Sequence, residues 1–254
     1  MYWTDTSLDL IRRANLDGSG MEDLVTSGLS VTYGIALDLS GGKMYWVDQG
    51  TLKIQRANLD GTVVEELVTA GLSSPEFIAV DPAGGRMYWT DSGNDTIKRA
   101  NLDGSGVQAL VSTGLNHANG IALDVAGGKM YWADGADGVI ERANLDGSGV
   151  ETLVTGQGGA NGIALDLTAG RIYWVSDSGN FIRRANLDGS SVQTVSPADM
   201  ASPKAIDIDA AAGKMYITES LGPPEQIRRA NLDGSSPELL VSSLGNVRGI
   251  ALDP

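Results

Sequence analysis

Two short acidic segments contain the oxygen atoms that a bound cation would need. Residues 91–95 read Asp-Ser-Gly-Asn-Asp, and residues 134–137 read Asp-Gly-Ala-Asp. Calcium sites need six or more converging oxygen ligands, and neither segment follows the EF-hand template that ends in a bidentate glutamate. The sequence therefore predicts no metal site and no cofactor, with a structural calcium ion left as an alternative.

The residue types that usually perform catalysis are sparse. His117 is the only histidine, and the chain has no cysteine. One histidine cannot form a His-based zinc site, and no motif positions a serine for a nucleophilic triad. We therefore predict no catalytic residue.

Most acidic turns belong to a repeated hexapeptide, Arg-Ala-Asn-Leu-Asp-Gly. In each copy the aspartate precedes a glycine, where a carboxylate commonly accepts backbone N–H bonds, so we expect a turn role rather than calcium ligation. The spacing of about 43 residues, with glycine-rich turns, indicates the blades of a propeller. The six copies begin at Arg13, Arg56, Arg99, Arg142, Arg184 and Arg229.

One repeat unit contains four short strands and three turns. Read from Asn119, the expected strands cover residues 119–124, 130–134, 139–145 and 150–155. Gly-Gly and Asp-Gly between alternating segments are hairpin signals that exclude helices. The sequence therefore predicts an all-β fold: one domain over residues 1–254, a six-bladed β-propeller of four-stranded antiparallel blades. We expect the C-terminal strand to pair with the N-terminal strands and close the ring.

The second strand of each unit is apolar on both faces. Met44 and Trp46 point to one side, and Tyr45 and Val47 to the other. Such a sheet must be covered on both sides, as neighbouring blades do in a propeller. The aromatic residues are therefore interpreted as core rather than as a carbohydrate-binding surface.

These second strands resemble the YWTD repeat, which is the class B repeat of low-density lipoprotein receptors. The segments are Tyr2–Asp5, Tyr45–Asp48, Tyr88–Asp91, Tyr131–Asp134, Tyr173–Ser176 and Tyr216–Glu219. The resemblance implies a six-bladed propeller that binds proteins on one face, and it favours an extracellular or cell-surface location.

Two further expectations concern the scaffold. The arginine of each hexapeptide and the aspartate of each Tyr-Trp strand occur once per blade, as a structural ion pair would. In the last two units the motif departs, since Ser176 displaces the acid to Asp177 and Ile217 replaces tryptophan. We expect less regular packing in those two blades.

Positions at which the six units differ are the candidates for binding. The residue before each Gly-Ile-Ala-Leu-Asp strand should lie at the mouth of the central channel, with Glu76 across the ring from Lys204. We predict a binding site there, with a water-satisfied rim as the alternative. The six residues are Tyr33, Glu76, Asn119, Asn161, Lys204 and Arg248.

The loops that follow the Tyr-Trp strands and those that join the blades should share the same face. They vary in length and chemistry, and loops on a rigid scaffold often carry binding residues. The loop residues predicted to contact a ligand are Asp9, Gln49, Asn94, Asp95, His117, Asp137, Phe181 and Glu225.

The net charge of −14 disfavours nucleic acid and anionic membranes. No apolar run approaches the length of a membrane helix, and we expect a monomer without membrane insertion. Three function hypotheses remain open: a non-enzymatic module that binds a protein or peptide, a propeller enzyme with a central metal of the lactonase or lyase kind, and an engineered or consensus scaffold without an evolved ligand. The first is preferred. Glu76, Asn119 and Asn161 could mimic the metal ligands of the second, but Lys204 and Arg248 would repel a cation.

Overall fold

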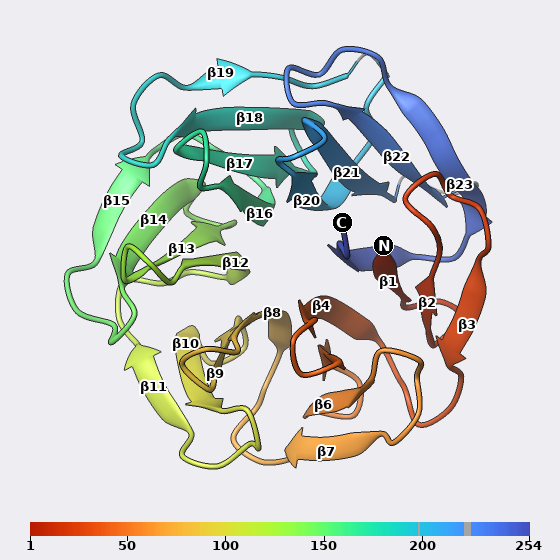
Figure 1. Cartoon of the computed structure of the whole chain (residues 1–254). Coiled ribbons are helices and arrows are strands. Elements are labelled where there is room, and N and C mark those ends of the chain that lie inside the picture. Colours follow the sequence, from red (N-terminus) through yellow and green to blue (C-terminus); the bar gives the residue numbers. More distant parts are fainter. Residues whose placement is uncertain (198, 221–224) are drawn as a thin grey trace.

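Six four-stranded antiparallel sheets surround a central channel in the computed structural model, which describes residues 1–197, 199–220 and 225–254. The sheets stand like blades around one axis, each with its first strand nearest the channel (Figure 1). The prediction of an all-β, six-bladed propeller is confirmed. No helix among the described residues is long and apolar enough to cross a membrane.

The strands follow one order in every blade. The first, innermost strands are β4 (Thr32–Asp38), β8 (Pro75–Asp81), β12 (Ala118–Asp124), β16 (Ala160–Asp166), β20 (Pro203–Asp209) and β24 (Val247–Ala251). The second strands are β1 (Tyr2–Asp5), β5 (Lys43–Asp48), β9 (Arg86–Asp91), β13 (Lys129–Asp134), β17 (Arg171–Ser176) and β21 (Lys214–Glu219). The third strands are β2 (Leu10–Arg13), β6 (Lys53–Asn58), β10 (Thr96–Asn101), β14 (Val139–Asn144), β18 (Phe181–Asn186) and β22 (Glu225–Asn231). The outer strands are β3 (Glu22–Val25), β7 (Glu65–Val68), β11 (Gln108–Val111), β15 (Glu151–Val154), β19 (Gln193–Thr194) and β23 (Glu238–Leu244).

One blade is built from both ends of the chain. Its strand order is β24-β1-β2-β3, and Tyr2 pairs with Ala251 while Trp3 pairs with Ile250. The two termini therefore lie side by side near the channel (Figure 1). This pairing confirms the predicted closure, which leaves no inner strand unpaired within that sheet.

The aromatic residues of the second strands form the core between blades. Trp3, Trp46, Trp89, Trp132 and Trp174 have no exposed surface, and the tyrosines that precede them are almost as deeply buried. Both faces of each second strand are covered, because each blade packs its two sides against two neighbours. The interpretation of these residues as core is confirmed.

The repeated hexapeptide joins each blade to the next. Its arginine donates to the carbonyl oxygen of the hexapeptide leucine in the following blade, as Arg99 does to Leu145 at 3.0 Å. The same bond recurs in every blade, so a ring of six bonds closes around the molecule. The bonds are Arg13–Leu59, Arg56–Leu102, Arg99–Leu145, Arg142–Leu187, Arg184–Leu232 and Arg229–Leu16.

The turn after the hexapeptide contributes to the same seam. Asp103 accepts hydrogen bonds from the backbone N–H and the hydroxyl of Ser105, which confirms the turn role of these aspartates. Gly104 has φ +85°, and a Cβ added there would lie 2.1 Å from the Leu67 carbonyl oxygen of the preceding blade. Glycine is therefore required both by the backbone conformation and by the close approach of two blades.

The predicted ion pair between the hexapeptide arginine and the strand aspartate is wrong. The arginine faces the neighbouring blade, whereas the aspartate binds a loop of its own face. Asp48, for example, accepts hydrogen bonds from the backbone N–H groups of Ser30 and Thr51. Charge partners of the strand acids come from the residue before the hexapeptide, as in the Lys98–Asp91 pair at 2.9 Å.

The two divergent blades are more regular than the sequence suggested. β17 and β21 have the same length and burial as their counterparts, and the Ser176 hydroxyl takes over the loop contacts by binding Gly158 O and Gly179 N. Ile217 is fully buried in the place of tryptophan. The expected irregularity appears in the outer strands: β19 has two residues, and β23 has seven and pairs with β22 through two register shifts.

Candidate functional site

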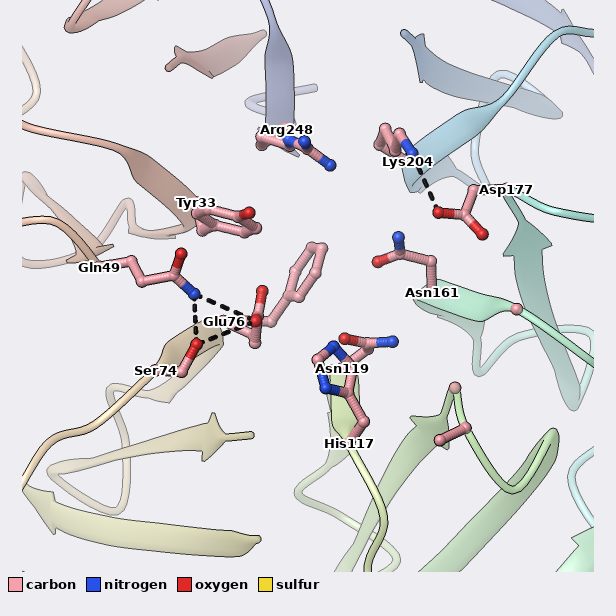
Figure 2. Close-up of a pocket in the computed structure, with 14 residues that line it drawn as sticks. Tyr33, Gln49, Ser74, Glu76, His117, Asn119, Asn161, Asp177, Lys204 and Arg248 are labelled. Carbon is pink, nitrogen blue, oxygen red and sulfur yellow. Dashed lines mark hydrogen bonds and ion pairs between the residues drawn. The ribbon is translucent and has the colours of Figure 1, made fainter. Parts of the chain in front are cut away.

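All six predicted channel-mouth residues line one pocket, which we call the upper pocket, on the face that carries the variable loops (Figure 2). Its volume is about 550 Å³. Gln49 and His117, two of the eight predicted loop residues, also line it. The sequence therefore placed these eight side chains together correctly, and their role in binding a ligand stays a prediction.

A bulge at the start of each inner strand positions the mouth residue. In β12, Ala118 pairs with Asp134 and Ile121 with Trp132, so one extra residue lies between the two pairs. The same shift occurs at the start of the other inner strands. Because a bulge interrupts the pleat and redirects a side chain, the residue before the repeated glycine projects into the channel mouth.

Threonine in the YWTD motif fixes the bulge in three blades. The Thr90 hydroxyl lies 3.1 Å from the Phe77 backbone N–H and donates to the Asn119 carbonyl oxygen of the next blade at 2.7 Å. Thr4 and Thr218 make the corresponding bonds to the carbonyl oxygens of Tyr33 and Arg248. The scaffold thus holds the backbone at three of the six mouth positions.

Glu76 is the acidic centre of the upper pocket. Its carboxylate accepts hydrogen bonds from Ser92 at 3.0 Å, from Gln49 at 3.2 Å and from Ser74 at 3.4 Å. Burial raises the pKa of Glu76 above its ordinary value, and these hydrogen bonds with the nearby charges of His117 and Arg248 counteract part of that rise. The carboxylate is thus held in place by neutral donors.

Two cationic side chains, Lys204 and Arg248, also line the pocket, and they differ in their partners. Lys204 forms an ion pair with Asp177 at 2.9 Å. Arg248 lies over the Tyr33 ring, 5.2 Å from its centre, and makes no ion pair among the described residues. Its Nε is buried without a hydrogen-bond partner there. Figure 2 shows both side chains facing the pocket, so Arg248 is the cation available to a ligand.

The remaining six loop candidates do not line the upper pocket, because they bind neighbouring loops. Asp9 and Asp95 accept from the backbone N–H groups of Val31 and His117, each at 3.2 Å. The other four make similar local contacts. Asn94 donates to Asp91, Asp137 accepts from Asn116, Phe181 stacks under Arg183, and Glu225 accepts from Val247.

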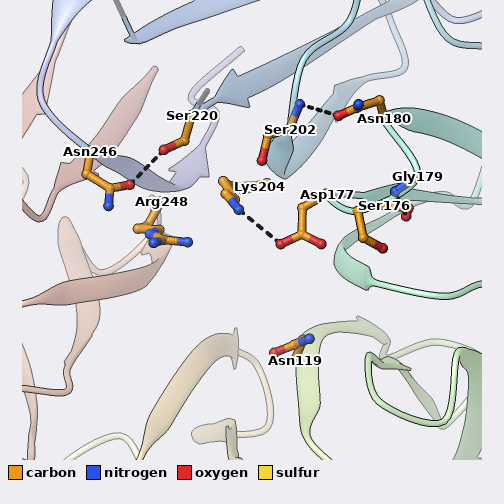
Figure 3. Close-up of polar contacts among 12 residues, drawn as sticks. Asn119, Ser176, Asp177, Gly179, Asn180, Ser202, Lys204, Ser220, Asn246 and Arg248 are labelled. Carbon is orange, nitrogen blue, oxygen red and sulfur yellow. Dashed lines mark hydrogen bonds and ion pairs between the residues drawn. The ribbon is translucent and has the colours of Figure 1, made fainter. Parts of the chain in front are cut away.

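The loops of the divergent blades are tied together in the same way. The Asn180 side chain accepts from the Ser202 backbone N–H at 2.7 Å, and Ser220 donates to Asn246 at 2.9 Å (Figure 3). Part of the variable loop from Ser220 to Gln226 lies outside the described residues. These contacts order the loops around the Lys204–Asp177 pair, which Figure 3 places between them.

Phe77 lies between two cavities of the channel. It was not among the predicted site residues. It lines the upper pocket and also a second cavity at the opposite end of the channel. Four of the other five units have glycine at this position, where inner strands of adjacent blades approach closely. A Cβ on Gly120, for instance, would lie 2.5 Å from the Asn161 carbonyl oxygen. The signal was present, since Phe77 is one of only two phenylalanines in the chain.

The fold and the pocket define a six-bladed β-propeller that presents a polar channel mouth on its variable face. The family model for the low-density lipoprotein receptor repeat class B matches residues 42–82, 85–125 and 128–167. These three segments therefore carry class B (YWTD) repeats, and the resemblance of the second strands to that repeat is confirmed.

Individual relatives agree with this assignment. Low-density lipoprotein receptor-related protein 4 from Homo sapiens is 53% identical over 38 residues, which cover 15% of this chain and 2% of that receptor. A crystal structure of a nidogen/laminin complex matches 98% of this chain and 95% of its own with a TM-score of 0.88 at 24% identity. A putative TolB from Agrobacterium tumefaciens covers 96% of this chain and 89% of its own, with a TM-score of 0.74 at 15% identity. The two solved structures are similar in fold.

Proposed function

We propose that residues 1–254 form one non-enzymatic recognition domain that binds a protein or peptide on the variable face. The observation that carries this proposal is the convergence of six residues from one divergent position of the repeat on a single pocket. A scaffold that needed only to close would not require different side chains there, because the seams elsewhere use the same residues in every blade. Variation at a rigid, hollowed face is typical of a binding surface.

The chemistry of the upper pocket suits a polar segment of a partner. Arg248 has no ion pair within the described part of the chain and offers its guanidinium to an acidic or carbonyl group, and the Asn161 side chain carries both a donor and an acceptor. Glu76, on the other side, can accept a further hydrogen bond. A loop that carries both charge and amide groups would satisfy all three residues.

Catalysis is less well supported by the same geometry. Glu76 accepts its hydrogen bonds from hydroxyl and amide donors, and Lys204 and Arg248 share its ring. Two cations on the ring oppose the binding of a catalytic metal. Metal analysis of the purified protein, followed by a lactone hydrolysis assay, tests the enzyme alternative directly.

The location and partners of the chain are part of the same proposal. Similarity to a receptor-related protein, and to a structure whose title names a complex with laminin, supports an extracellular or cell-surface protein that binds another protein. The net charge of −14 supports the absence of nucleic acid as a partner. We propose that the chain acts as a monomer.

The experiment is selection of a displayed random-peptide library on the immobilised protein, followed by affinity measurement on the double variant E76A/R248A. We expect at least a tenfold loss of affinity, since hydrogen bonds to charged groups contribute about 1.5–3 kcal/mol each. The control is K53A/E66A, which also removes one cation and one acid but at an ion pair on the outer rim. Equal affinities of the two double variants would contradict the proposal.

A further inference from the structure

The second cavity, which we call the lower channel, lies at the opposite end of the axis from the upper pocket. It has a volume of about 320 Å³. Its walls come from the inner strands, and each of them contributes an isoleucine: Ile35, Ile78, Ile121, Ile163, Ile206 and Ile250. Leu39 and Leu167 also line it, and they are 46% and 47% exposed. The side chains that line the cavity are therefore mainly apolar, the backbone of the inner strands supplies most of its polar surface, and the cavity reaches the surface.

One wall of the lower channel carries a carboxyl group. Asp207 occupies the position that is alanine in each of the other five units, at Ala36, Ala79, Ala122, Ala164 and Ala251. Its side chain lines the cavity and remains partly exposed. The single departure from alanine thus places a charged group among apolar walls.

The protein uses only part of the hydrogen-bonding capacity of the Asp207 carboxylate. One carboxyl oxygen accepts from the Ile208 backbone N–H at 2.8 Å, and the other accepts from the Leu252 N–H at 2.9 Å. No Lys or Arg in the described ranges forms an ion pair with it. The amino group of Met1 attracts the carboxylate but donates its hydrogen bond to the Ala14 carbonyl oxygen. Each carboxylate oxygen can accept more than one bond, so capacity remains toward the cavity.

Phe77 closes the lower channel at its inner end. It lines both cavities, and it packs against the apolar cluster that contains Ala205, on the opposite side of the ring, as well as against the cluster that contains Ile121. A molecule entering from the lower face would therefore meet apolar walls, an aromatic end and one carboxylate.

We propose that the lower channel binds a small cation with an apolar body, an alkylammonium, whose ammonium group pairs with Asp207 while its chain covers the isoleucine walls. The two backbone N–H bonds compensate the burial of the Asp207 carboxylate only in part, so a paired cation stabilises it further, and the apolar side chains of the walls gain free energy when water is displaced from them. The net charge of −14 also attracts cations to the molecule. This site is separate from the upper pocket and does not depend on the function proposed for it.

The experiment measures binding of hexylammonium by calorimetry at pH 7.5, with hexanol as an uncharged probe of equal chain length. We expect hexylammonium to bind at least tenfold more tightly than hexanol, because hydrogen bonds to charged groups are stronger than those between neutral groups. D207A should remove this preference and leave two weak, similar affinities. Alanine at the equivalent positions of the other units makes this substitution compatible with the fold, and D207N provides a second, isosteric variant.

Repeating the measurement at a lower pH distinguishes the contribution of the carboxylate to binding from that of the apolar walls. Burial raises the pKa of Asp207 to about 6; the nearby Asp209 adds to the rise, and the two backbone N–H bonds and the Met1 amino group oppose it. At pH 5 most Asp207 is therefore protonated, so hexylammonium binding should weaken severalfold whereas hexanol binding should not change.

The control variant is E76Q, which neutralises the buried carboxylate of the upper pocket and should leave hexylammonium binding unchanged. Three results would overturn the proposal: no saturable binding of hexylammonium, equal affinities for the two probes, or loss of binding in E76Q with retention in D207A. The last result would move the ammonium site to the upper pocket. Failure of the library selection on the upper face would leave the lower-channel result unaffected.

Discussion

The two faces of the propeller use the repeat in opposite ways. On the lower face the hexapeptide and its Asp-Gly turn are nearly the same in all six blades, because each blade must present the same carbonyl to its neighbour. On the upper face the bulged residues differ in every blade except the two that carry asparagine, and their contacts with the neighbouring blades differ from one blade to the next. The same residues thus recur where every blade makes the same contact with its neighbour, and they differ where the contacts differ.

The largest effect should come from the core that both faces share. Trp89→Ala removes a fully buried indole between two blades and should lower the free energy of unfolding by about 3–5 kcal/mol. Gln49→Ala, on the upper face, should cost about 1–2 kcal/mol, because it removes the hydrogen bonds that a partly exposed side chain donates to Ser74 and to the Glu76 carboxylate. Urea denaturation of both variants measures the difference. Comparable losses would mean that the upper loops are part of the scaffold.

A smaller effect should distinguish two reasons for glycine on the lower face: a close approach between blades and a positive φ. Gly104 and Gly128 both have positive φ, but only Gly104 has a neighbouring blade in the space of a Cβ. Alanine at either position should cost about 1 kcal/mol through backbone strain. Gly104→Ala should cost about 1–3 kcal/mol more, because the seam must open to admit the methyl group.

Thermal and urea unfolding of the two glycine variants give the comparison directly. If G104A and G128A were equally stable, the close approach at the hexapeptide turn would not be a constraint. The uniformity of the lower face would then need another cause.

The smallest effect should appear where the scaffold supports the variable residues. Thr90→Val keeps the shape of the side chain, and valine occupies this position at Val47 and Val175. It leaves the Phe77 N–H and the Asn119 carbonyl without their shared partner, which should cost about 1–2 kcal/mol. The matched control is Thr155→Val at an exposed position, and equal unfolding curves for both variants would contradict the role of the hydroxyl in fixing the bulge.

The architecture could be predicted from the sequence because each of the six units contains the same strand and turn signals. Strand order, closure and the mouth position all follow from glycine turns and from alternation repeated in six units. The residues Glu76 and Arg248 were found as departures from that repeat at a position whose placement the other copies define. Where many copies share one geometry, a single divergent side chain can be located from spacing alone.

Other features depend on which blade a side chain reaches, and spacing within one unit does not contain that information. The hexapeptide arginine was assigned to its own blade, but it extends to the next. Asp9 and Asp95 have positive φ, at 51° and 47°, and turn toward a neighbouring loop rather than outward. Phe77 and Asp207 are substitutions within the repeated inner strand, so a prediction based on the residue before that strand does not include them.

The ring of six arginine bonds has no first or last member, although the chain that builds it has two ends. Each blade is attached only to its two neighbours, so parting at any one boundary would turn the toroid into an arc of five joined boundaries with two bare flanks. Those flanks would expose the indole and phenol rings that are otherwise wholly enclosed. The stability of the closed ring against opening consequently depends on all six boundaries between blades. The boundary that separates most easily determines it.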